Sequence, residues 1–341
     1  MLPMLKLMRN LVLLLCFTPI ISFSQTTNEE INSLLNDATL YAGKFVNPAT
    51  EAVVYQASSA WMMSAKKRKT WDFTFAVNNN LFLVPKSNRE MNISNADFEN
   101  FYIEGTNPND NSLVSVPTAF GDKSSVNLIG TITFNGTPQT FKTKLDGINQ
   151  ETVYYPYLHG ALALPYGFEV LAKYSFKNKL KKGDYQVYGV GLQYNISQHF
   201  KKLTDKNWNI AALIAYNNEN FNVDIFQSSG STISLGIESM NSKINSYHAQ
   251  INASKTFNKI EVMGGIVLNS SNIKYYFVGE PTLFDFSSLF NEKVKDLYKT
   301  QTIVFGEISG RYNFYKDFML QTTFSFGSQF NTNFGIQYGF N

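Results

Sequence analysis

The chain has little of what disulfide-bonded folds, metal sites and nucleic-acid binders rely on. Its 341 residues include one cysteine and three histidines, and only 16% are Asp, Glu, Lys or Arg. One cysteine excludes a disulfide scaffold, and three scattered histidines offer no metal site. The 29 basic residues barely exceed the 26 acidic ones, so we expect no nucleic-acid partner. A mean hydropathy of -0.18 leaves no room for a bundle of apolar membrane helices.

Aromatic residues, by contrast, are abundant. The chain has 29 Phe, 19 Tyr and 3 Trp, and 44% of all residues are hydrophobic. This content is too apolar for a disordered chain. The composition therefore favours an aromatic-rich β protein or a β-barrel.

Residues 1–24 have the pattern of a secretory signal peptide. An apolar stretch over 11–21 follows a positive start and precedes a small-residue cleavage site before Gln25. Cys16 lies inside the apolar stretch, behind three leucines rather than the small residues of a lipoprotein site. The alternative is an uncleaved anchor. The residues that carry the signal pattern are Lys6, Arg9, Ser22 and Ser24.

Residues 25–69 form a leader with a helical or irregular pattern. Acidic residues followed by Ile31, Leu34 and Leu35 predict a capped amphipathic helix. Pro48 is expected to end any helix at that point. A leader of this kind plugs the lumen of a following barrel or docks in the periplasm, and both alternatives remain open.

From about residue 70 to residue 341 the hydrophobic pattern has a period of two. One face of each segment is apolar, with aromatic residues towards its ends, and the other is rich in Gly, Ser, Asn and Gln. This pattern predicts a transmembrane antiparallel β-barrel of about 14 strands, with about 12 or 16 as alternatives. Strands are faint over 87–145. The pattern is clearest in the C-terminal half, where one such apolar face consists of Trp208, Ile210, Ala212, Ile214 and Tyr216.

The expected connections differ in length. Short turns fall at 257–259 and 315–317, whereas longer connections fall at about 279–300 and in a polar stretch around 217–221. Short inner turns and longer outer loops are typical of bacterial outer-membrane barrels. We therefore expect an outer-membrane location, surrounding lipid and a C-terminus in the periplasm.

The last strand and the leader carry a resemblance to known barrels. The C-terminal residues Phe334, Ile336, Tyr338 and Phe340 resemble the signal read by the barrel-assembly machinery. Asn47-Pro48-Ala49, in a helical leader ahead of the alternating region, is similar to the plug of the long-chain fatty-acid transporter (FadL-like) family. The chain is shorter than that family and has no glycine-rich opening. The resemblance implies an uncharacterised relative with a plug at 25–69 and a barrel at 70–341.

This resemblance also implies a function. It predicts a passive, plug-gated channel or carrier for small hydrophobic molecules that needs no cofactor. The alternative is a structural or partner-docking barrel without a transported substrate. A carrier requires an apolar path through the plug, whereas a docking barrel predicts a filled lumen.

Two segments supply the candidate ligand or gate residues. Asn47 and Pro48 form a candidate kink between plug and wall, or simply a turn. The loop over 280–299 carries apolar side chains that need a partner. They form a gate at the outer mouth, or else the loop folds onto its own aromatic residues. The loop candidates are Leu283, Phe284, Phe286 and Phe290.

Little in the chain favours an enzyme, and a barrel enzyme is the third and least favoured hypothesis. Ser246 and His248 are two residues apart on one expected strand, so both point the same way. No third group is visible that would orient the histidine. We therefore expect no catalysis and no metal.

Overall fold

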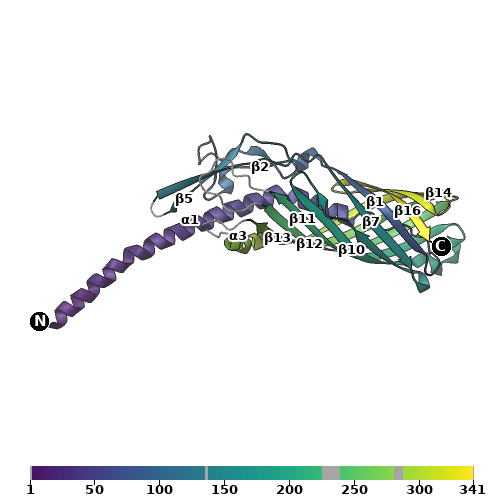
Figure 1. Cartoon of the computed structure of the whole chain (residues 1–341), viewed down its shortest axis with the longest axis horizontal. Coiled ribbons are helices and arrows are strands. Elements are labelled where there is room, and N and C mark those ends of the chain that lie inside the picture. Colours follow the sequence, from purple (N-terminus) through teal and green to yellow (C-terminus); the bar gives the residue numbers. More distant parts are fainter. Residues whose placement is uncertain (1, 135–136, 225–238, 280–286, 341) are drawn as a thin grey trace.

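The computed structural model describes residues 2–134, 137–224, 239–279 and 287–340. Within this part of the chain, ten strands close into an antiparallel barrel, as the alternating pattern predicted (Figure 1). A further two-residue strand, β9 (Asn178–Lys179), pairs with the last ring strand. The ring order is β11 (Trp208–Asp224), β12 (Ser239–Phe257), β13 (Ile260–Val278), β14 (Lys299–Tyr315), β15 (Phe318–Phe326), β16 (Phe330–Phe340), β1 (Phe73–Leu83), β7 (Thr152–Ala163), β8 (Phe168–Tyr174) and β10 (Gly183–Asn195), which pairs back to β11.

The two ends of the barrel differ in their connections. At the turn end, strands are joined by tight turns such as 258–259 and 316–317, and the C-terminal strand finishes there. At the loop end, the connections include 84–151 and 279–298. Longer turn-end connections hold η3 (Pro165–Gly167), η4 (Ile196–His199) and α2 (Lys201–Thr204). The predicted short turns are confirmed, and short and long connections gather mainly at opposite ends.

The expected number of about 14 strands is wrong for this barrel, as are the alternatives of about 12 and 16. The first reason is strand length, because β11 and β14 have 17 residues each and β12 and β13 have 19. The polar stretch 217–221, expected as a loop, is part of β11. The second reason is that, as far as the structure describes residues 84–151, they contribute no strand to the ring.

Residues 84–151 instead form a cap at the loop end (Figure 1). It contains two small antiparallel sheets, ordered β2–β4 and β3–β5–β6, whose short strands explain the faint sequence pattern. The cap packs with the N-terminal helix and the inner faces of the barrel strands in one apolar core. Its elements are η1 (Lys86–Asn88), β2 (Glu90–Ile93), η2 (Asn95–Asp97), β3 (Tyr102–Ile103), β4 (Val114–Pro117), β5 (Asn127–Phe134) and β6 (Thr137–Lys144).

The N-terminal helix α1 (Leu2–Ser58) enters the barrel from the loop end (Figure 1). Pro48 does not end it, contrary to expectation, and the helix continues to Ser58. Proline removes one backbone hydrogen-bond donor from the helix. On both sides of Pro48, however, the helix packs against apolar side chains of the cap and barrel, and this burial stabilises a continuous helix. No described helix is long and apolar enough to span a bilayer.

The outer face of the barrel changes character along its length. On β11 it is apolar from Trp208 to Tyr216 and then carries Asn218, Asn220 and Asn222. On β12 and β13 the same change follows Tyr247 and Leu268. The inner face does the reverse, since polar side chains near the turn end give way to apolar ones near the loop end. These buried apolar side chains are Phe221, Val223, Met240, Ile244, Ile273, Tyr275 and Phe277.

Candidate functional site

An apolar groove opens at the loop end, where α1 meets the start of β14. Its volume is about 390 Å³, within the range of small-molecule sites of roughly 300–1,000 Å³. Helix α1, the cap strand β2, the barrel strand β13 and the segment leading into β14 all contribute to it. The lining residues are Leu40, Gly43, Lys44, Asn47, Pro48, Met91, Tyr275, Leu297 and Lys299.

Polar groups stand at the edge of this groove. Lys44 forms an ion pair with Asp97 of the cap at 3.1 Å. Lys299 donates a hydrogen bond to the Asn47 side chain, and its Nζ lies 3.7 Å from a Glu51 oxygen. Asn47 in turn donates to Glu51 at 3.0 Å. The groove therefore combines an apolar floor with a few fixed polar groups, as small-molecule sites do.

Gly43 sets how closely α1 approaches Leu297. A Cβ atom at position 43 would stand 2.8 Å from Leu297 Cδ2. Leu297 lies in η5 (Val294–Leu297), just after α3 (Ser287–Lys293). Leu297 Cδ2 lies at the end of a flexible side chain, which can move. A larger residue at position 43 would therefore displace Leu297 and fill the groove rather than break the helix.

The segment that follows the C-terminal end of α1, residues 59–65, crosses the lumen and is called the strap. Its backbone is irregular and needs hydrogen-bond partners. The polar inner face of the barrel supplies them: Glu307 accepts from Ala60 N at 2.7 Å, Gln193 donates to Ser64 O at 2.8 Å, and Asn195 donates to Ala65 O at 2.7 Å. The polar side chains of the inner face therefore form hydrogen bonds with the strap rather than with water in an open channel.

Lys173 holds the junction between helix and strap. Its fully buried ammonium donates to Ala57 O at 3.1 Å and to Ser59 O at 2.8 Å. It also lies 4.7 Å from the centre of the Trp61 ring. A cation at a helix C-terminus is favourable because the last carbonyl groups lack intrahelical partners.

Trp61 fills the middle of the lumen. Cβ atoms at Gly189 and Gly191 would stand 3.0 Å and 3.3 Å from its ring. The two glycines thus fit a strand whose inner face must stay small. Beside the strap remains a cavity of about 10 Å³, room for about one water molecule. At the level of Trp61 and the strap, the lumen is therefore filled.

The predicted site residues do not come together as one group. Asn47 and Pro48 line the groove. Phe290 is fully buried in α3 and packs against Phe277 of the barrel strand β13, at 5.3 Å between ring centres. Leu283, Phe284 and Phe286 lie outside the described residues.

The C-terminal residues lie on β16, which closes the ring between β15 and β1. Phe334, Ile336 and Phe340 are exposed on its outer face. Phe340 contacts Phe73 at 5.6 Å between ring centres, and Tyr338 contacts Phe318 at 4.7 Å. These residues therefore stand where the first and last strands meet.

Ser246 and His248 both point into the lumen, but they have separate partners. Ser246 donates to Glu219 at 2.7 Å, whereas His248 contacts Gln250 at 3.1 Å. Among the described residues, no cluster of His, Cys, Asp and Glu could hold a metal ion.

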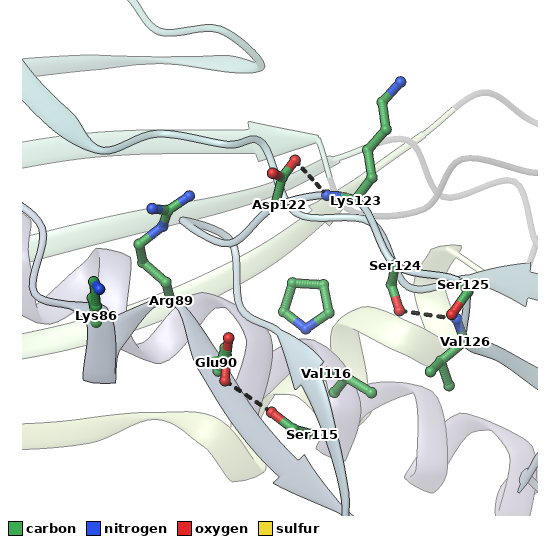
Figure 2. Close-up of a pocket in the computed structure, with 11 residues that line it drawn as sticks. Lys86, Arg89, Glu90, Ser115, Val116, Asp122, Lys123, Ser124, Ser125 and Val126 are labelled. Atoms are coloured by element: carbon green, nitrogen blue, oxygen red, sulfur yellow. Dashed lines mark hydrogen bonds between the residues drawn. The ribbon is translucent and has the colours of Figure 1, made fainter.

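A second pocket, of about 600 Å³, lies in the cap between β2, β4 and the segment 122–126 (Figure 2). Its walls carry both signs of charge, with Lys86, Arg89 and Lys123 against Glu90 and Asp122. Arg89 is paired with Glu151 at 2.8 Å, and Ser115 donates to Glu90 at 3.1 Å. The mixed charges favour no single class of ligand.

Sequence reasoning missed most of the groove. Leu40, Gly43, Met91, Tyr275 and Leu297 come from four separate segments, and none belongs to a motif. Lys173 and Glu307, which hold the strap, also gave no signal. The nearest indication in the sequence is that both charged residues fall at inward-facing positions of a strand, where a buried charge needs a partner.

The family model that matches the chain is described as a family of unknown function (DUF6588) and covers residues 4–340. No curated protein matches the sequence. Among solved structures, the chain is similar to the attachment invasion locus protein Ail of Yersinia pestis, with 7% identity and a TM-score of 0.28 over 80% of this chain and 100% of that one.

Two further similar structures come from other bacteria. For the COG4313 outer membrane channel of Pseudomonas putida F1, the identity is 9% and the TM-score 0.40, over 83% of this chain and 100% of that one. For the translocator domain of the autotransporter NalP of Neisseria meningitidis, they are 8% and 0.32, over 89% and 99%. Likeness at this level carries no argument about function. Because the family model spans nearly the whole chain, this protein belongs to the DUF6588 family.

Proposed function

We propose that this protein is a passive outer-membrane barrel that captures a small hydrophobic molecule at the loop-end groove. The apolar band on its outer face supports the location. On β11 the band runs from Trp208 to Tyr216, which fits the 9–11 residues that a tilted strand needs for an apolar band of about 25 Å. A cleaved signal peptide at 1–24 is part of the proposal.

The difference between the two ends supports an orientation. Tight turns of outer-membrane barrels lie in the periplasm and longer connections outside. The turn end then faces the periplasm and the cap faces the exterior. The last strand, with Phe334, Ile336, Tyr338 and Phe340, would be the segment read by the barrel-assembly machinery.

The groove is the observation that carries the proposed ligand. It is apolar, it has the volume of a small-molecule site, and it lies at the end proposed to face outwards. Asn47 and Pro48 line it, and they are also the residues that resemble the plug of the FadL-like family. Binding would involve no catalysis and no cofactor.

The filled lumen limits how a captured molecule could cross the barrel. Residues 25–69 would act as a plug, because the strap is held by side chains of several strands. Passage into the periplasm would therefore require the strap to leave its partners. The proposal is a gated carrier and not an open pore.

Photo-crosslinking tests the groove. The mature protein is purified in detergent and labelled with a diazirine-bearing fatty acid, with and without excess unlabelled fatty acid. We expect competable labelling in peptides that contain 40–48 and 297–299. Labelling of the apolar band should not compete, because detergent and lipid cover it.

Two variants sharpen this test. Gly43→Leu should remove most of the competable labelling by filling the groove. Leu113→Glu is the control, since Leu113 is 71% exposed in the cap and does not line the groove. Labelling that is competable but unaffected by Gly43→Leu would contradict the proposed site.

The filled lumen favours a second candidate, a docking or structural barrel without a transported substrate. The cap and α1 would then present a rigid surface to another envelope component. The two candidates differ in one outcome. The docking barrel predicts no competable labelling anywhere, whereas the carrier predicts it at the groove.

A further inference from the structure

Two lysines face each other on the outer surface of the barrel. The strand register places Lys243 of β12 directly opposite Lys274 of β13, and both side chains are exposed. Like charges in this position repel each other and destabilise the sheet. A negatively charged partner would relieve this repulsion.

The described residues provide no such partner. Neither lysine takes part in an ion pair among the described residues. Lys243 lies 5.3 Å from the centre of the Tyr276 ring, a contact with no negative charge. Among the outward described residues of β11 to β13 beyond the apolar band, only Asp224, at the end of β11, is acidic.

Polar groups surround the pair. Asn220 of β11 stands opposite Lys243, and Asn241 stands opposite Tyr276. On the side towards the apolar band, Asn218, Asn245 and Asn272 form the next row across the three strands. The result is a patch of two cations among amide groups, all of which can donate hydrogen bonds to an anion.

The patch lies just beyond the edge of the apolar band on the outer face of the barrel. Lys243 lies four residues beyond Tyr247, the last aromatic residue of the apolar band on β12. With a rise of about 3.3 Å per residue and a tilt of about 40°, this is roughly 10 Å above the band. Lipid headgroups lie in this layer, just outside the hydrocarbon core.

We propose that this patch, formed by Lys243, Lys274, Asn220 and Asn241, binds the phosphate groups of an anionic lipid of the outer leaflet. The inference rests on the proposed outer-membrane location, with the loop end outside. Acyl chains cover the apolar band, so their headgroups meet the patch directly above it. A phosphate between the two ammonium groups removes their repulsion.

Native mass spectrometry of the detergent-purified mature protein tests this inference. The probes are lipid A, which carries two phosphates, and its dephosphorylated form. The double variant Lys243→Gln/Lys274→Gln should bind lipid A roughly 25-fold more weakly, about fivefold for each lysine. Binding of the dephosphorylated lipid should stay unchanged.

A matched control removes the same charge elsewhere. Lys86→Gln/Lys123→Gln takes two exposed lysines from the cap, outside the patch, and should change lipid A binding by less than about twofold because salt screens distant charges. Heat-modifiable migration in gels checks that each variant is folded. Equal binding of both lipids by the wild type, or unchanged binding by the Lys243→Gln/Lys274→Gln variant, would overturn the inference.

A second measurement separates this inference from the proposed location. Asn109→Cys places a thiol in the exposed part of the cap. Labelling of intact cells with a membrane-impermeant maleimide should modify it. A labelled cap with no effect of the lysines rejects the inference alone, whereas an unlabelled cap rejects the orientation on which both depend.

Discussion

On strands β11 to β13, the two halves of the barrel wall have opposite polarity. In the half near the turn end, apolar side chains face outwards and polar ones face the strap. In the half near the loop end, amides and lysines face outwards, and apolar residues such as Phe221 and Ile244 pack against α1. The same strands pass through both halves without a break. The solvent proposed for each half, lipid or water, accounts for the inversion.

This difference shows that neither the inner nor the outer face of a barrel strand keeps one polarity along its whole length. Near the turn end the strap's backbone requires polar partners, and near the loop end the helix requires apolar ones. Substitutions that test each half separately should therefore have different effects on the two faces of one strand.

The largest expected effect is on the inner face of the loop-end half. Phe221 is 1% exposed, so Phe221→Ala should lower the free energy of unfolding by about 3–5 kcal/mol through lost burial and the cavity left behind. Asn222→Ala, on the next residue and the opposite face, should stay within about 0.5 kcal/mol. Urea unfolding of the vesicle-embedded protein measures both, and equal effects would contradict a core at this level.

The outer face gives the next effect. Ile266 of β13 is 60% exposed in the middle of the apolar band. Ile266→Arg should cost about 2–4 kcal/mol if lipid surrounds it, as for Arg at the bilayer midplane. Asn272→Arg, six residues further on the same face, should cost less than about 1 kcal/mol. The free energies of unfolding are measured in vesicles. Equal losses for the two variants would contradict a membrane boundary between positions 266 and 272.

The strap provides a smaller effect. Lys173→Met leaves the carbonyl oxygens of Ala57 and Ser59 without their buried donor, at a cost of about 1.5–3 kcal/mol for hydrogen bonds to a charged group. Lys177→Met breaks a surface pair with Asp184 and should cost about 0–1 kcal/mol. Urea unfolding measures the costs, and proteolysis near the strap should rise in Lys173→Met alone. A variant as resistant as wild type would mean that other contacts hold the strap.

The predictability of the fold follows the same division. Trp208 to Tyr216 alternate between an apolar outer face and a polar or small inner face, so the sequence was enough to identify a barrel. Beyond Tyr216 the outer residues are three asparagines and Asp224, so the polar stretch predicts a loop although Phe221 and Val223 keep the alternation. The inverted half therefore escaped detection, and the strand number was overestimated.

The groove was predictable only in part. The sequence indicates Asn47 and Pro48 because they are adjacent in the chain, whereas Met91, Tyr275 and Leu297 join them through tertiary packing. No periodicity in a single segment encodes such convergence. For Phe290 the sequence offers only its apolar character, which cannot distinguish an exposed gate residue from a buried core residue.

The smallest expected effect concerns the lysine pair on the outer face of the loop-end half. Lys274→Glu would turn the repulsive pair with Lys243 into an attractive one. In detergent without anionic lipid, the free energy of unfolding should rise by about 0.2–1 kcal/mol. The gain should shrink in 1 M salt, where the screening length is about 3 Å. Lys123→Glu, on the cap, serves as the control and should give no such gain. A loss of stability in Lys274→Glu would mean that the wild-type lysine already has a partner in the folded protein. A gain, together with weaker lipid A binding, would show that the sheet tolerates repulsion here because a ligand relieves it.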